Sequence, residues 1–239
     1  MNGYTPMMLK SRKIVVAAAI AAIAVLPAAA CSSDDSSDSA SSSTAATSSA
    51  APSAAESSAP APVATIPTLT GRDTAVALDT GFTDALTALK LTPGVVGGAK
   101  LENGSLVFPI TGGNVTYYTP GSIQPYVQGK IEHAGAGFSL TAGQTVVDIT
   151  NLTIDPGTSK LMADVAVNGQ VAATQAIVFD LDGSTLKPLQ SNPDGTAVLE
   201  GTRVLISDTA AGLLNKTFNT DAVKAGLLVG IAKITVNTK

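Results

Sequence analysis

The sequence predicts a mainly β fold, either an antiparallel β-sandwich or a partly open barrel with one or two short helices. Short runs of β-branched or alternating apolar residues recur along the chain, and turn-forming residues separate them. The regularly spaced helices that a parallel βαβ fold needs are missing. Hydrophobic residues make up 45% of the 239 positions and charged residues 13%, which excludes a wholly disordered chain.

The expected strands and turns alternate along the chain. Strand patterns cover residues 75–78, 105–108, 146–149, 162–167 and 204–206. Type I′ hairpin turns are expected at Asn103-Gly104, Asn168-Gly169 and Asp182-Gly183, because Asn, Asp and Gly tolerate the positive φ that this turn requires. Further turns are expected at residues 155–157 and 193–195. This spacing is typical of antiparallel strands joined by short connections.

Two segments have helical rather than strand spacing. In residues 82–89 three apolar side chains fall on one helical face, with Asp79 or Thr80 as the N-cap. The second segment is residues 208–215, which Asp208 would open. Both helices are short, so each is expected to persist only by packing against the sheet.

The first thirty residues have the layout of a bacterial lipoprotein signal peptide. Lys10, Arg12 and Lys13 precede an apolar run at residues 14–26, and small residues then lead to Cys31. The apolar run is shorter than the roughly 20 residues of a membrane-spanning helix, so cleavage is expected. The Ala-Ala-Ala-Cys ending resembles a lipobox, in which the Cys receives a diacylglycerol. The alternative is an ordinary secreted protein cut after an Ala-x-Ala site, with Cys31 left as a free thiol.

Residues 31–65 are expected to form a disordered stalk and residues 66–239 a single extracytoplasmic domain. Of the 33 positions from 32 to 64, 13 are Ser and 10 are Ala, so this segment offers nothing for a core. Without residues 1–30 the chain has 11 basic and 18 acidic side chains, a net charge of −7. That charge disfavours nucleic acid and anionic headgroups, so the membrane is expected to be reached through the lipid on Cys31.

The sequence offers little for catalysis or metal binding. One Cys, one His and no Trp exclude disulfide frameworks, Cys/His zinc sites and Trp-lined sugar sites. His133 is the only imidazole, and the chain has no Gly-x-Ser-x-Gly nucleophile elbow for a Ser-His-Asp triad. Residues 180–184 resemble the start of a calcium loop, but Leu189 stands where such a loop needs Glu. We therefore predict a non-enzyme without a metal site.

Paired carboxylates are the remaining enzymatic alternative. Glu132 with Asp148, or Asp164 with Asp180, could act as general acid and base only if they faced one cleft at a defined separation. Glycoside-cleaving sites also usually have aromatic platforms, and this chain has only 5 Phe and 4 Tyr.

The candidate ligand-binding residues are Tyr117, Tyr118 and His133. Tyr117 and Tyr118 are adjacent in an expected strand, so one points towards the core and the other outwards or into a pocket. Tyr126 lies close by, directly after Pro125, and His133 follows it. The alternative is ordinary packing, with tyrosines at the edge of a sheet and a histidine that hydrogen-bonds a nearby turn.

Several motifs resemble a family of uncharacterised exported lipoproteins of actinobacteria. Residues 108–113 match its Phe-Pro-Ile-Thr-Gly-Gly strand, and residues 129–133 match its Gly-x-Ile-x-His strand. Residues 137–143 are similar to the Gly-rich turn that follows, and residues 225–232 to the end of the family's domain.

That group is in turn distantly similar to HtaA-type haem-binding domains of actinobacterial surface proteins. Those domains are β-rich and hold haem iron through a Tyr phenolate supported by a His, and a phenolate is a suitable ligand for ferric iron. The resemblance implies that Tyr117 or Tyr118, together with His133, could take these roles.

Together these observations predict a surface-displayed lipoprotein of the cell envelope, anchored through Cys31 to the outer face of the cytoplasmic membrane. Its domain is expected to be non-catalytic, to serve a structural or ligand-binding purpose and to need no cofactor. The alternative is a carrier of haem or of another hydrophobic ligand. A preformed apolar cavity would favour the carrier, and a filled core would count against it.

Replacing the lipidation residue tests the anchor. Cys31→Ala should release the protein into the medium or leave an uncleaved precursor, because the side chain that takes the lipid is gone. Fractionation and immunoblotting of cells that express the two forms would measure this. Unchanged processing and membrane retention of the variant would contradict the lipoprotein prediction.

Overall fold

The computed structural model describes residues 59–239, which form one continuous sheet of thirteen strands together with two helices. The strands are β1 (Ala64–Ile66), β2 (Arg72–Leu78), β3 (Thr92–Gly97), β4 (Lys100–Glu102), β5 (Ser105–Pro109), β6 (Gly112–Tyr117), β7 (Val127–Ala142), β8 (Thr145–Asp155), β9 (Lys160–Val167), β10 (Gln170–Asp182), β11 (Gln190–Ser191), β12 (Thr196–Ile206) and β13 (Leu228–Asn237). The helices are α1 (Thr80–Ala88) and α2 (Asp208–Phe218). The predicted signal peptide, Cys31 and most of the predicted stalk lie outside the described residues.

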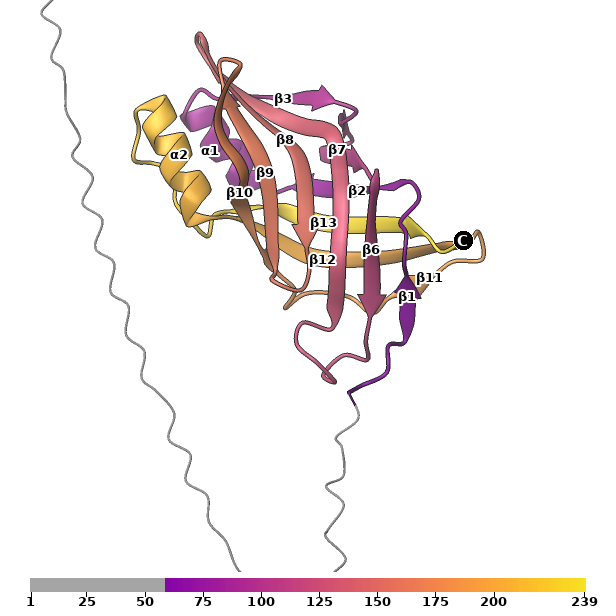
Figure 1. The fold of residues 1–239 in the computed structure, drawn as a ribbon. Helices are drawn as coiled ribbons and strands as arrows, with labels where there is room; N and C mark the ends of the chain where they lie inside the picture. The colour runs from indigo at the N-terminus through magenta and orange to yellow at the C-terminus, as the bar shows by residue number, and fades with distance from the viewer. Residues whose placement is uncertain (1–58) are drawn as a thin grey trace, which may run out of the picture. The chain divides into compact units, whose positions relative to one another are not determined.

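All pairings between these strands are antiparallel, and the sheet curls into a half-barrel. Its main order is β1-β6-β7-β8-β9-β10-β12-β13-β2-β5-β4, with β11 added beside β12 and β3 beside β7. Figure 1 shows β6 to β9 side by side in front of β12 and β13, which run across them, and both helices at one end. The predicted fold class, an antiparallel sandwich or partly open barrel with one or two short helices, is confirmed.

A crease crosses β7, β8, β9 and β10, where the pairing of neighbouring strands shifts in register at one level. Register shifts interrupt the pairing of β7 between His133 and Gly137, and the neighbouring strands shift at the same level. Asn151 and Gln175 occupy the left-handed region there, with φ values of 53° and 44°. Such bulges bend a strand and increase its twist.

A polar network on the exposed face of the crease satisfies the backbone groups that the shifted register leaves unpaired. The Asn151 side chain accepts from the Gly135 amide at 2.9 Å and donates to Asp164 at 2.8 Å. The other carboxylate oxygen of Asp164 accepts from the Gln175 amide at 2.9 Å. These hydrogen bonds lower the pKa of Asp164, with that from Asn151 the largest cause. The crease is therefore held by side chains of β8, β9 and β10 and by one backbone amide of β7.

The bend lets β7 serve two walls of the half-barrel. Its residues 127–132 pair with β6, whereas residues 136–141 pair with β3 on the same edge. Gly137 lies at the turning point, where a Cβ atom would stand 2.1 Å from the Ile149 carbonyl oxygen. The close approach of the two backbones at this point requires glycine.

The core is filled at the end of the half-barrel that carries the helices. Phe138 stacks on Phe179 with ring centroids 6.0 Å apart and lies 6.5 Å from Phe108. Helix α1 buries Phe82 and Leu86 against this end, and α2 buries two alanines and a leucine. Within residues 59–239, neither helix combines the length and apolarity that crossing a membrane would require.

Local sequence signals gave most of the turns and caps correctly. Both residues of Asn103-Gly104 and of Asn168-Gly169 have positive φ, as a type I′ turn requires, and Asp79 caps α1 by accepting from the Gly81 amide. The turns predicted at residues 155–157 and 193–195 also connect antiparallel strands.

Helix α2 begins at Asp208, as predicted, but the hairpin turn predicted at residues 182–183 does not form. The N-cap of α2 is Ser207, whose hydroxyl accepts from the Ala210 amide at 3.0 Å and donates to the Ile177 carbonyl at 2.7 Å, so Asp208 is already helical. Neither residue of Asp182-Gly183 adopts a positive φ. The Asp182 carboxylate instead accepts from Ser184 and Arg203, both at 2.8 Å, and the chain continues through residues 183–189 to β11. A charged partner from β12 therefore replaced the expected hairpin.

Two glycine-to-alanine substitutions should shift stability in opposite directions. Gly137→Ala should lower the free energy of unfolding by about 1–3 kcal/mol or more, because the new methyl group would overlap the backbone of β8. Gly212→Ala should raise it by about 0.5–1 kcal/mol, because Gly212 lies within α2 with nothing within 4 Å of an added Cβ. Denaturant unfolding measures both. Equal effects of the two changes would contradict the close approach at the crease.

Candidate functional site

A cavity of about 620 Å³ occupies the half-barrel, lined by strands from both walls of the curled sheet. Its lining comes from β1, β2 and β6 to β13 and from the connections next to them. Most lining side chains are Val, Leu, Ile or Ala, with a few hydroxyl groups, and none of them is charged. A mainly apolar cavity of this size is typical of small-molecule sites.

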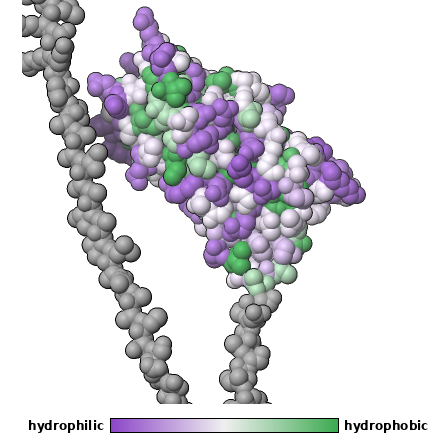
Figure 2. Space-filling view, viewed as in Figure 1, coloured by the Kyte–Doolittle hydropathy of each residue, from purple (hydrophilic) through white to green (hydrophobic). Residues whose placement is uncertain are grey.

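Strand alternation explains which residues line the cavity. Thr74 and Val76 of β2 face it, and so do Ala232, Ile234 and Val236 of β13, with every second side chain pointing inwards. Figure 2 shows apolar side chains in several separate places on the viewed face, scattered among polar ones. On that face the described residues show no single large apolar patch.

Two tyrosines stand in the wall of the cavity. Tyr117 at the end of β6 is buried, and Tyr126 lies in the connection from β6 to β7. Their rings meet edge to face with centroids 5.7 Å apart. Burial, and to a lesser extent Tyr117, raises the pKa of Tyr126, so this phenol is protonated at neutral pH. Both phenols offer an oxygen that could serve as a hydrogen-bonding group or as a metal ligand.

The neighbouring Tyr118 does not belong to the residues that line the cavity. It is half-buried, and its amide donates to the Tyr126 carbonyl at 2.8 Å, which ties the two ends of the connection together. The predicted split of the adjacent tyrosines between two environments is therefore observed, with Tyr117 on the cavity side.

His133 lies in the core beside the cavity and is connected to it by a hydrogen bond from the Thr74 hydroxyl. The side chain is 1% exposed, Nδ1 lies 3.3 Å from the Leu152 carbonyl oxygen, and Nε2 lies 2.9 Å from the Thr74 hydroxyl. A carbonyl only accepts, so Nδ1 carries the proton and Nε2 accepts from Thr74. Thr74 lines the cavity, whereas His133 does not. The structure thus links the predicted histidine to the cavity indirectly.

Burial lowers the pKa of His133 to about 4, and the hydrogen bond to the Leu152 carbonyl opposes this only in part. The imidazole is therefore neutral at pH 7. Tyr126 is protonated at the same pH, so the described groups on this side of the cavity are uncharged.

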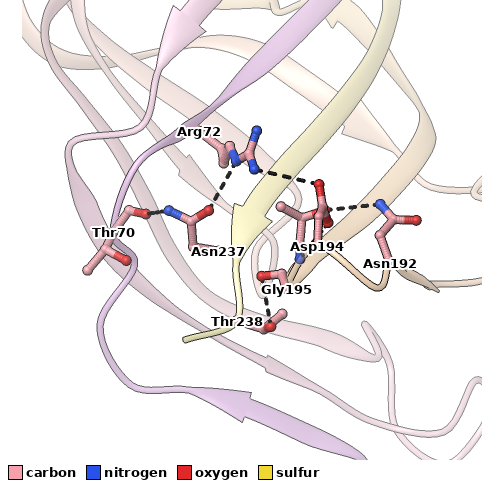
Figure 3. Close-up of polar contacts among 8 residues, drawn as sticks. Thr70, Arg72, Asn192, Asp194, Gly195, Asn237 and Thr238 are labelled. Atoms are coloured by element: carbon pink, nitrogen blue, oxygen red, sulfur yellow. Dashed lines mark hydrogen bonds and ion pairs between the residues drawn. The ribbon is translucent and has the colours of Figure 1, made fainter.

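A polar cluster lies beside the cavity, at the starts of β2 and β12 and the end of β13. We call it the rim cluster: Thr70, Arg72, Asn192, Asp194, Gly195, Asn237 and Thr238, which Figure 3 labels, together with Thr196, which hydrogen-bonds Asn192 and Asp194. Arg72 donates through Nε to Asn237 at 3.1 Å, and Asn237 donates to the Thr70 carbonyl. The Thr238 hydroxyl donates to the Gly195 carbonyl at 3.0 Å. Because Thr238 itself lines the cavity, the cluster fixes this part of its rim.

The carboxylates considered as catalytic pairs do not form an active site in the cavity. None of Glu132, Asp148, Asp164 and Asp180 lines it. Glu132 pairs with Lys130, Asp180 with Lys160, and Asp164 holds the crease. Within residues 59–239 no group of three or more His, Cys, Asp or Glu side chains is placed to hold a metal ion.

Sequence reasoning identified Tyr117 as a candidate but did not include Tyr126. The available signal was the clustering of all the domain's tyrosines around a connection that contains Pro120 and Pro125. The pattern could not reveal that this connection folds back so that its last aromatic ring meets Tyr117.

The neutral burial of His133 predicts a pH-dependent stability. In the unfolded chain the imidazole has its ordinary pKa near 6.5, against about 4 when folded, so between these values the unfolded chain binds the proton more strongly. The free energy of unfolding should fall as the pH falls from about 6.5 to 4, by up to about 3 kcal/mol, with no contribution of this group above pH 7.

The chain has a single histidine, so its NMR signals report this group directly. A titration of the folded protein should show no midpoint above pH 5, and denaturant unfolding at pH 7 and pH 4.5 should show the loss. His133→Gln should reduce the difference between the two pH values. A folded-state midpoint between pH 6 and 7 would contradict the burial of a neutral imidazole.

No protein-family model matches the chain, and the comparison with curated proteins also gives no match. Among solved structures, the chain is similar to the C-terminal domain of HtaA from Corynebacterium glutamicum, with a TM-score of 0.51 at 16% identity over 71% of this chain and 98% of that one. The haem-binding protein HtaB of the same organism gives a TM-score of 0.40 at 10% identity over 73% and 96% of the two chains. The predicted distant similarity to HtaA-type domains is confirmed for the fold: this half-barrel is similar to that of the HtaA C-terminal domain.

Proposed function

We propose that this protein is a non-catalytic, surface-displayed lipoprotein whose β domain carries a hydrophobic ligand, with haem as the leading candidate. The observation that carries the proposal is the apolar cavity of about 620 Å³ within the half-barrel. A domain with a purely structural role would be expected to fill this space with side chains, because interiors are normally close-packed. A preformed apolar cavity with a few polar groups is the usual form of a ligand site.

The anchor is part of the same proposal and rests on the sequence. Cys31 follows a signal-peptide pattern, and a Ser- and Ala-rich segment separates it from the domain. A flexible segment of this length spans roughly 30 Å on average, which would hold the domain clear of a membrane surface. A tethered carrier could take up a ligand outside the cell and keep it at the envelope.

The residues present fit haem. The cavity has the apolar lining that a porphyrin needs, and Tyr117 and Tyr126 offer phenol oxygens in its wall. Haem would supply a ferric iron, for which a phenolate is a suitable ligand once the phenol has lost its proton. His133 would not touch the haem itself. It would orient the hydroxyl group of Thr74, which lines the cavity and lies 2.9 Å from His133 Nε2. The resemblance to HtaA-type haem-binding domains points to the same ligand.

The test is a titration of the purified protein with ferric haem, followed by absorbance, with three phenylalanine variants. A saturable one-to-one spectrum is expected for the wild type, and Tyr117→Phe or Tyr126→Phe should weaken binding at least tenfold and alter the spectrum, because the ligating oxygen is removed. Tyr118→Phe is the matched control, since this side chain does not line the cavity, and it should bind like the wild type.

The same titration has outcomes that would overturn the assignment. Absence of saturable haem binding would remove haem as the ligand. Binding that all three variants leave unchanged would show that no tyrosine of this cluster holds the iron. A loss confined to Tyr118→Phe would place the haem outside the cavity.

A further inference from the structure

The cavity is lined by no charged side chain, but one basic residue, Arg72, belongs to the rim cluster beside it. Arg72 begins β2 two residues before Thr74, which lines the cavity. Its register partner on β13 is Val236, which also lines the cavity. Arg72 therefore stands at the rim, where the apolar interior ends.

The other basic residues next to the lining strands have the phase opposite to that of the lining residues. They are Lys130, Lys160, Arg203 and Lys233, and each directly neighbours a lining residue in its strand, so it points to the outer face. Three of the four also have an acidic partner within 3 Å. Arg72 differs from them because it belongs to the rim cluster and because its register partner, Val236, lines the cavity.

The guanidinium of Arg72 is held in place but has donors to spare. Its Nε donates to Asn237 at 3.1 Å, while a terminal nitrogen lies 3.6 Å from the Asp194 carboxylate, too far for a hydrogen bond. Within residues 59–239 the two terminal nitrogens make no hydrogen bond. The pair with Asp194 is also exposed at 46% and 59%, and exposed pairs of this kind are weak. A ligand carboxylate that reaches hydrogen-bonding distance of the terminal nitrogens could therefore displace Asp194 from Arg72.

The backbone at this point is unusual for an arginine. Gly71 and Arg72 both lie in the left-handed region, with φ values of 70° and 67°. Glycine and asparagine adopt this region with less strain than a long side chain does. An arginine in such a position favours a role for its side chain.

We propose that the cavity accepts an amphiphile with an apolar body and a carboxylate end, and that Arg72 binds the carboxylate at the rim. The inference rests on the proposed function, since it needs the cavity to hold a ligand. The apolar body would lie among uncharged side chains, and the carboxylate would take two parallel hydrogen bonds from the free terminal nitrogens. A fatty acid and a porphyrin carry the same end group, so the experiment includes both.

The experiment measures dissociation constants of the purified full chain for two matched pairs of probes. One pair is hexadecanoic acid and hexadecanol, and the other is ferric haem and its dimethyl ester. Arg72→Gln should weaken binding of the carboxylate member about tenfold in at least one pair and leave its neutral partner unchanged. Asp194→Asn should tighten binding of the same carboxylate, because it removes the competing charge but keeps an acceptor for Thr196.

Arg203→Gln is the matched control, because Arg203 lies on the outer face in an ion pair with Asp182. It should leave all four dissociation constants unchanged. Thermal unfolding of each variant shows whether the fold is kept, and the opposite effect of Asp194→Asn keeps the test decisive if Arg72→Gln unfolds.

The outcomes separate this inference from the proposed function. An effect of Arg72→Gln on the fatty acid alone or on haem alone supports the anchor and identifies the source of the carboxylate. Neutral and carboxylate probes that bind equally well, or that Arg72→Gln weakens equally, would overturn the anchor while the cavity remains a ligand site. If no probe binds, both the carrier function and the anchor are wrong.

Discussion

The crease across β7 to β10 is the constraint on which the rest of the structure depends. A long antiparallel sheet twists but does not close around a space unless something bends it, and bulges are the usual means. Here the bend lies at the same level in adjacent strands, and Asp164 is its central acceptor. These hydrogen bonds replace part of the pairing that the register shift removes. Within residues 59–239 no buried side-chain nitrogen or oxygen lacks a hydrogen-bond partner.

Once the sheet is bent, its two halves contain different side chains. The end under the helices receives the large rings of Phe108, Phe138 and Phe179, which fill it. The other half is lined mainly by aliphatic side chains and small hydroxyl residues, whose opposing walls do not meet across the half-barrel. Packing at the end under the helices can stabilise the fold. At the other end the side chains around the cavity lack packing partners, and a bound ligand would supply them. A ligand that binds only the folded state stabilises it, so carrying a ligand and keeping the cavity open are compatible.

Local signals in the sequence predicted the fold class, both helices and five of the thirteen strands, and long-range pairings decided the rest. Asn103-Gly104 forms its turn because the needed φ values are a property of the two residues themselves. Asp182-Gly183 does not, because β10 pairs at this end with β12, where Arg203 is the register partner of Asp182, and not with the segment that directly follows it. Alternation shows that Thr74 faces inwards, but it carries no information on whether the opposite wall touches it. The cavity, the position of Tyr126 and the crease all depend on which residues distant in the sequence come into contact, and a local pattern does not contain this information.

The electrostatics of the half-barrel follow from the same geometry. Strand alternation sends Lys130, Lys160 and Arg203 outwards, where each has a carboxylate partner. Inside, burial keeps the imidazole of His133 neutral and raises the pKa of the Tyr126 phenol. The apolar body of a ligand inside the cavity would therefore contact no charged side chain, and the nearest charged groups would be those of the rim cluster. Since an unpaired charge in an apolar interior is costly, a charged group of any ligand in this cavity would have to remain at that boundary, so the ligand would enter with its apolar end first.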